Sequence, residues 1–230
     1  MFSQISNAFL NYIKGFGSTP VANIIKSWEN KPIASCVLGI SQKETNSNII
    51  NNISLHASLL LMNKEIDYEI DDSVLQKEVG IVIEYGNYNK NSSDQDKDNI
   101  MKGLVIYRYG DEGGLRYYVK KYGEYIKELG NSGYIDLNIE QDNQQTFFMF
   151  IQKFVKPENT KSIKSNYYKS LNNYNNHTFI IEALKELKPY FNLGNVYPSD
   201  STMAKKKSKA KLDFIPSDIK TELENYLKKY

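Results

Sequence analysis

The sequence predicts an α+β domain in which an antiparallel sheet packs against helices. The chain has 230 residues, of which 40% are apolar and 24% charged, enough for a hydrophobic core. Segments with strand-like apolar patterns fall between residues 32 and 139, whereas helical stripes lie towards both ends. Two of the strand segments, 103–109 and 115–119, flank the Gly-rich turn 110–114, which is typical of an antiparallel hairpin.

Composition limits the class of protein. The net charge of +2 does not mark the whole fold as a nucleic-acid binder. A single cysteine excludes an intramolecular disulfide and a zinc-thiolate cluster, and it favours a reducing, cytoplasmic compartment. The first residues lack the basic start of a secretory signal, and no apolar run approaches the ~20 residues of a membrane span.

Residues 1–30 are predicted to form an N-terminal helical segment. A helical stripe begins after Ser3, a candidate cap, and ends at Gly15. A second short helix is expected at 20–28. This segment is expected to pack on the body of the protein.

The first predicted strand spans 32–41 and carries Cys36, the only cysteine. Nothing nearby in the sequence would lower the pKa of its thiol, so we expect a buried, unreactive side chain. The residues that share its face of the strand are apolar: Ala34, Leu38 and Ile40. A polar loop is expected at 42–52.

The second predicted strand, 53–62, carries His56, one of only two histidines. One face of this strand is apolar, and His56 lies on the other face between Ser54 and Ser58. Small polar neighbours leave space around the imidazole. His56 is therefore either a half-exposed strand histidine or a functional one.

The middle of the chain contains further strands. The acidic stretch 63–78 reads as a strand extension or a hairpin, and it lacks the spacing of a calcium loop. A strand at 80–86 contains Glu84, and 87–99 reads as a long loop. The pair Gly113-Gly114 lacks both a Walker lysine and the dinucleotide-binding spacing, so no cofactor is predicted.

Three elements lead to the second histidine. A helix is predicted at 120–129 and a strand at 133–139. The aromatic stretch 144–155 fits either a helix or a strand, and Pro157 closes it.

The stretch 172–184 reads as a loop that turns into a helix. Asn175 or Asn176 is a candidate cap, and Pro189 stops the helix. His177 therefore lies in the first turn, where the helix dipole should favour the neutral imidazole.

The end of the chain is basic and then helical. Residues 199–212 read as a solvated linker, or as a nuclear-import or polyanion-binding patch. A C-terminal helix is predicted within 213–230, capped by Ser217. The lysines that would contact a polyanion are Lys205, Lys206, Lys207, Lys209 and Lys211.

The order of these parts resembles the circularly permuted papain-like fold, as in the lecithin:retinol acyltransferase-like and NlpC-related thiol enzymes. Leu55-His56-Ala57-Ser58-Leu59-Leu60 is similar to the family motif that carries the catalytic histidine. Asn176-His177-Thr178-Phe179 is similar to the later Asn-Cys-x-x-Phe motif at a helix start, with its Phe one position earlier. The resemblance implies a papain-like core over residues 31–198.

The resemblance also implies roles for three residues. His56 would be the base, Glu84 would orient its imidazole, and residue 177 would be the nucleophile at a helix start. His177 stands where the family has cysteine, so thiol catalysis is not expected from this sequence. Without the resemblance, Glu84 would be a strand-end charge that faces water.

Four functions follow from these residues. We favour a catalytically inactive or diverged papain-like domain, a pseudoenzyme that binds a protein or a peptide- or acyl-like ligand. A second is a thiol hydrolase or acyltransferase, if the natural residue at position 177 is cysteine. A third is a zinc or iron site of His56, His177 and Glu84, although no H-x-x-x-H pair is present. A fourth is an interaction module that contacts an acidic partner through the lysine run.

Overall fold

The computed structural model describes residues 24, 26–28, 30–44, 53–67, 71–86, 104–107, 114–130, 133–154, 176–190, 196–198 and 214–228. The predicted helix after Ser3, the loop at 87–99 and the lysine run at 205–211 lie outside these residues. Of the predicted helix at 20–28, one turn is described, in which the Trp28 amide donates to the Ile24 carbonyl at 3.0 Å.

The described strands form one sheet in the order β4-β5-β3-β2-β1-β6-β7, and β8 also pairs with β6. Every described pairing is antiparallel, and β4 and β5 form the predicted hairpin. This confirms the α+β class and the antiparallel sheet. The strands are β1 Ser35–Glu44, β2 Ile53–Met62, β3 Val79–Gly86, β4 Leu104–Tyr107, β5 Gly114–Lys121, β6 Gly133–Ile139, β7 Pro189–Tyr190 and β8 Val196–Pro198.

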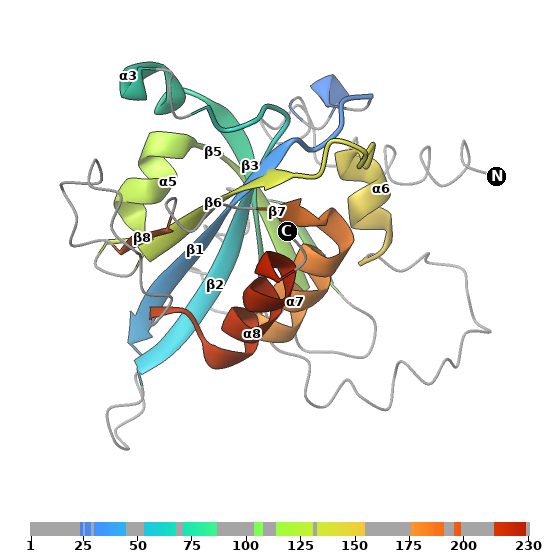
Figure 1. Ribbon diagram of the computed structural model, residues 1–230. Helices are drawn as coiled ribbons and strands as arrows, with labels where there is room; N and C mark the ends of the chain where they lie inside the picture. Colours follow the sequence, from blue (N-terminus) through green and yellow to red (C-terminus); the bar gives the residue numbers. More distant parts are fainter. Residues whose placement is uncertain are drawn as a thin grey trace, which may run out of the picture.

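Helices cover both faces of the sheet. Figure 1 shows α7 and α8 side by side against one face and α5 against the other. The helices are α3 Asp72–Leu75, α5 Tyr122–Glu128, α6 Phe147–Gln152, α7 Asn176–Leu187 and α8 Ser217–Leu227.

The central strand β2 lies between β1 and β3, and helices cover both of its faces. Its alternating side chains divide the interior into two cores. Leu59 and Leu61 belong to the larger core, with side chains of α6, α7 and α8. Leu60 and Met62 belong to the smaller core, with side chains of α5. His56 lies on the α5 face, as its spacing from Leu60 requires.

Three predictions of local structure need correction or completion. Residues 72–75, expected in a strand or hairpin, form α3, because the Asp71 carboxylate accepts from the Ser73 amide at 2.9 Å and starts a helix there. Residues 42–44, expected in a loop, continue β1 opposite β2. The stretch at 144–155, left open between helix and strand, contains α6, whose Thr146 side chain caps its start by accepting from the Met149 amide.

The C-terminal helix is part of the main body. Ile219 and Leu223 are fully buried in the larger core, so α8 is not a separate segment. The predicted capping by Ser217 is wrong, since Pro216 occupies the cap position and no side chain caps the helix there.

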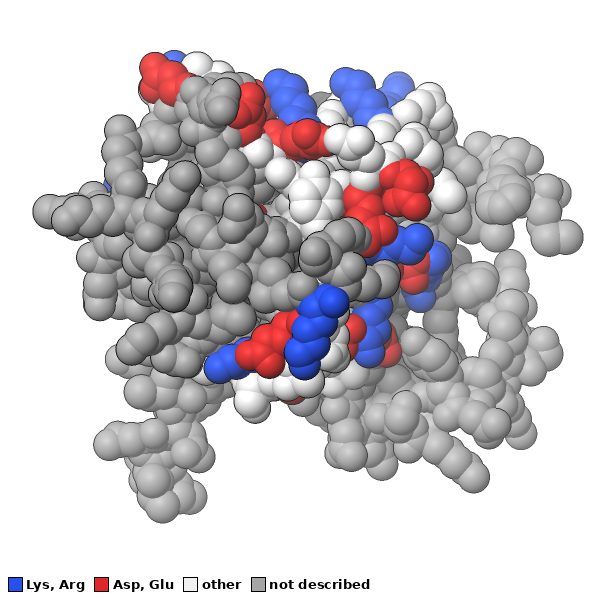
Figure 2. Space-filling model, viewed as in Figure 1, with Lys and Arg blue, Asp and Glu red and all other residues white. Residues whose placement is uncertain are grey.

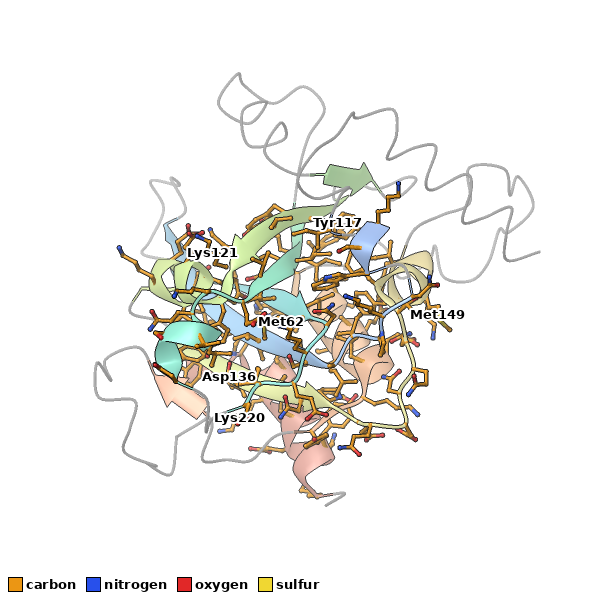
Figure 3. All side chains as sticks on the ribbon, turned by 90° about the horizontal axis from the view of Figure 1, so that it is seen from above. Met62, Tyr117, Lys121, Asp136, Met149 and Lys220 are labelled. Carbon is orange, nitrogen blue, oxygen red and sulfur yellow. The ribbon has the colours of Figure 1, made fainter. Side chains whose placement is uncertain are left out.

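The described surface mixes charges. Figure 2 shows acidic and basic side chains interspersed over the described part of the face that it draws. Large apolar side chains exposed among the described residues are Val74 and Met149, and Figure 3 shows Met149 at the rim of the molecule. Among the described helices, none has the length and apolar character needed to cross a membrane.

Candidate functional site

The strands β2 and β3 separate part of the way along their length. Their ladder pairs Leu61 with Ile81 and ends at the pair of Leu59 with Ile83. Continuing the same register would pair Ala57 with Tyr85, but a side chain from α7 lies between these two residues instead. We call this place the β2–β3 split, defined by Leu55 and Ala57 of β2 and Tyr85 of β3.

The side chain in the split is the carboxamide of Asn176, the first residue of α7. Its Oδ1 accepts from the Ala57 amide at 2.7 Å. Its Nδ2 donates to the carbonyl of Ala57 at 2.7 Å and to that of Tyr85 at 3.0 Å. Asn176 therefore does not cap the helix, because its oxygen accepts from the sheet and not from its own helix. The other predicted candidate, Asn175, lies outside the described residues.

An asparagine suits the split because its side chain offers one acceptor and two donors. These bind one amide and two carbonyls at the place where the β2–β3 ladder stops. Phe179, one turn further along α7, stacks on Tyr85 with ring centroids 6.4 Å apart and meets Phe154 edge-on at 5.3 Å. Polar and aromatic contacts together hold the start of α7 against the sheet.

His56 and Glu84 are in contact, as the resemblance implies. The His56 Nε2 lies 3.0 Å from the Glu84 Oε2, and the side chains are only 11% and 5% exposed. Glu84 is therefore a buried, paired carboxylate, and the alternative of a strand-end charge facing water is wrong. His56 is likewise more buried than a half-exposed strand histidine.

The contact with Glu84 makes one ring nitrogen of His56 a hydrogen-bond donor and leaves the other as an acceptor. A carboxylate accepts, so Nε2 carries the hydrogen and Nδ1 keeps the lone pair of a base. Within the described chain, Nδ1 has no hydrogen-bond partner. The imidazole is thus oriented on one side and basic on the other.

Other polar groups lie on the same face of the sheet. The Ser58 hydroxyl and the Tyr125 hydroxyl are 2.8 Å apart, and Tyr125 also donates to the Ser58 carbonyl at 3.0 Å. Burial raises the pKa of Tyr125, and the nearby Tyr118 and Glu84 add to this. The phenol therefore stays neutral and helps α5 to close over the strands.

The His56–Glu84 pair, which we call the dyad, and the start of α7 lie on opposite faces of the sheet at the split. His56 and Glu84 directly precede Ala57 and Tyr85, the two residues that Asn176 bridges. Strand alternation sends the dyad side chains to the α5 face, whereas Ala57 and Tyr85 belong to the core that contains Phe179.

Each ring nitrogen of His177 faces an oxygen atom of the protein. Nε2 lies 3.2 Å from the Leu55 carbonyl, and Nδ1 lies 3.2 Å from the Asp218 Oδ2 of α8. The contact with Leu55 is a hydrogen bond and the contact with Asp218 is an ion pair, so both are favourable together only when both nitrogens carry hydrogen. The neutral imidazole expected from the helix dipole alone would lose one of the two. No hydrogen bond joins the two histidines of the described chain.

The remaining candidates are not brought to this site. Among the described residues, no three His, Cys, Asp or Glu side chains are grouped as metal ligands would be. Cys36 is fully buried, and burial, with a smaller contribution from Asp136, raises the pKa of its thiol well above the usual range. This confirms the expected buried, unreactive thiol.

Sequence reasoning missed two parts of the site. Asp218, which binds His177, is an acidic residue in the first turn of α8, a position that usually only signals favourable helix charge. Tyr125 is one of 18 tyrosines, and nothing local marked it. Both contacts depend on tertiary packing.

Comparison of the chain with models of protein families, with curated proteins and with solved structures finds no match.

Proposed function

We propose that this chain is a diverged, permuted papain-like domain that has lost thiol chemistry and acts as a binding module for a protein or a peptide- or acyl-like ligand. The observation that carries the proposal is the pair of contacts made by the His177 ring, a hydrogen bond to the Leu55 carbonyl and an ion pair with Asp218. Both ring nitrogens of His177 face oxygen atoms of the protein, those of Leu55 and Asp218, so this side chain connects α7 to β2 and α8 and is not positioned as a nucleophile.

The His56–Glu84 pair supports the papain-like part of the proposal. A buried carboxylate that orients an imidazole is the base-and-orienter arrangement of thiol enzymes. Removing two charged or polar groups from water costs free energy that their pairing only partly offsets. Apolar residues of similar size would pack at least as well, so stability alone does not explain this pair. In the proposal it lines the former groove and offers the basic Nδ1 to a ligand.

Restoring the nucleophile tests the papain-like site. The His177→Cys variant places a thiol at the start of α7, next to the β2–β3 split. If the site is papain-like, its thiolate should persist at lower pH, and iodoacetamide should label it about tenfold faster near pH 6 than an ordinary thiol, for each unit by which its pKa falls. The rate of labelling is followed by mass spectrometry across the pH range.

The chain offers two controls for this measurement. The unmodified protein reports the background, because its only cysteine, Cys36, is fully buried. Ser217→Cys places a thiol at the exposed first position of α8, a helix start without the dyad. A third variant, His177→Cys with His56→Gln, removes the base.

The labelling rates of these variants distinguish a papain-like site from an ordinary helix start. Fast labelling of H177C that is lost with His56→Gln supports the papain-like site. Equal rates and pH profiles for H177C and S217C, in variants that keep the native circular dichroism spectrum, would reject it.

Binding is tested separately from thiol chemistry. Because the chain has two histidines, the Cε1–H proton signal of His56 is assigned by comparison with H56Q. Titration with an N-acylated dipeptide amide should shift this signal to saturation and leave the signal of His177 in place. An unchanged His56 signal at millimolar ligand counts against a groove at the dyad.

The lysine run and the compartment stay predictions of the sequence. Contact with a polyanion through Lys205–Lys211 and a cytoplasmic or nuclear location are secondary to the proposed binding role.

A further inference from the structure

We infer that His177 and Asp218 form a proton-dependent clasp that holds the first turn of α8 over the start of α7. The clasp is a geometric feature of the fold, and only its consequence, control of access to position 177, rests on the proposed function. It joins three elements, since His177 of α7 bonds Leu55 of β2 and Asp218 of α8.

The carboxylate of Asp218 is held for this role by its own helix. Its Oδ1 accepts from the Ile219 amide at 3.0 Å, which directs Oδ2 towards His177. Asp218 is 47% exposed and His177 25% exposed, so the contact lies at the rim of the interface, where a proton can reach it.

The proton dependence follows from the two acceptors. Leu55 offers a carbonyl and Asp218 a carboxylate, so the ring needs a hydrogen on each nitrogen to bond both. A histidine that loses one hydrogen loses its charge and turns a lone pair towards one of these oxygens, so either the ion pair with Asp218 or the hydrogen bond to Leu55 is lost. The clasp should therefore close at lower pH and weaken at higher pH.

The other charged groups on the elements around His177 are engaged in contacts of their own. Lys185 of α7 pairs with Glu222 of α8 at 3.4 Å, and Glu84 of β3 pairs with His56 of β2. Lys220 of α8 and Glu182 of α7 also have interactions of their own. None of these groups is an acceptor on the His177 ring.

Release of the clasp should be local. Ile219 and Leu223 are fully buried in the larger core, and the Lys185–Glu222 pair lies further along α8. These contacts keep α8 in place, beside α7 as in Figure 1, while its first turn loosens. Loosening there uncovers position 177.

Hydrogen exchange measures the clasp in the full chain. The reporter is the Lys220 amide, which forms the first hydrogen bond of α8 by donating to the Pro216 carbonyl at 2.8 Å. Its protection, corrected for intrinsic exchange, should be about threefold to fivefold higher near pH 5.5 than near pH 8, the effect of a partly exposed ion pair.

Three single variants complete the test. Asp218→Asn and His177→Gln should each remove this threefold to fivefold difference, measured beyond the change in global stability that Asp136 causes equally in every variant. Glu222→Gln should keep the difference, because it breaks only the neighbouring ion pair. His56 is present in all of them, so its own titration cannot explain a difference. Equal pH dependence in D218N and the unmodified protein would overturn the inference. This outcome leaves the proposed function standing, since that depends on the labelling of H177C.

Discussion

Asn176 forms two hydrogen bonds of 2.7 Å with Ala57, one to its amide and one to its carbonyl, across 119 residues of sequence. A third bond reaches the Tyr85 carbonyl on the next strand. One side chain thus replaces a rung of the β2–β3 ladder and fixes where α7 begins.

Asn176→Ala should destabilise the fold strongly. The change leaves one amide and two carbonyls in the split without partners, which should lower the free energy of unfolding by about 2–4 kcal/mol. Asn176→Asp should do no better, because a carboxylate cannot donate to the two carbonyls. Urea unfolding followed by circular dichroism measures both variants. Asn225→Ala, on the exposed side of α8, is the matched control and should change stability little. A loss no greater than that of N225A would show that the split does not need the carboxamide.

The His56–Glu84 pair should show coupling in a double-mutant cycle. His56→Gln and Glu84→Gln should each destabilise the protein, and the double variant should lose less than the sum by about 1–2 kcal/mol, because both single variants break the same hydrogen bond. The exposed Lys64–Glu78 pair, at 2.9 Å with 65% and 32% side-chain exposure, is the comparison. Its coupling should stay below about 1 kcal/mol. Coupling at the dyad that is no larger than at this surface pair would mean that burial adds nothing to it.

Asp136 should make the protein more stable in mild acid than at neutral pH. Its carboxyl is 2% exposed on β6 and labelled in Figure 3, and burial raises its pKa from 3.8 to about 7, although hydrogen bonds from the Tyr122 hydroxyl oppose the rise. Between pH 4 and 7 the folded protein therefore keeps a proton that the unfolded chain has released. The free energy of unfolding should fall as pH rises through this window, by on the order of 2–4 kcal/mol, and level off above it.

Asp136→Asn removes this titration while keeping an acceptor for Tyr122. The variant should lose most of the slope between pH 4 and 7 and should be the more stable protein at pH 8. Asp142→Asn, at an exposed turn, is the control and should keep the slope. Parallel stability curves for D136N and the unmodified protein, measured by urea unfolding at each pH, would contradict the assignment.

Local sequence patterns were enough to predict the class of the fold and most of its described elements. Strand alternation placed His56 on a different face from Leu55 and Ala57, and the helical stripe after residue 176 placed His177 in a first turn, because both periods follow from local backbone geometry. The resemblance to a thiol-enzyme family also brought His56 and Glu84 together as a pair, and the structure has them in contact.

The contacts that these residues make follow from tertiary packing and not from local sequence. The role of Asn176 depends on the separation of two strands far away in the sequence, and no local pattern shows where a ladder stops. The partner of His177 comes from a helix 41 residues later, whose position depends on burying Ile219 and Leu223. Periodicity reports which face a side chain occupies, whereas the contacts across that face depend on how distant elements pack.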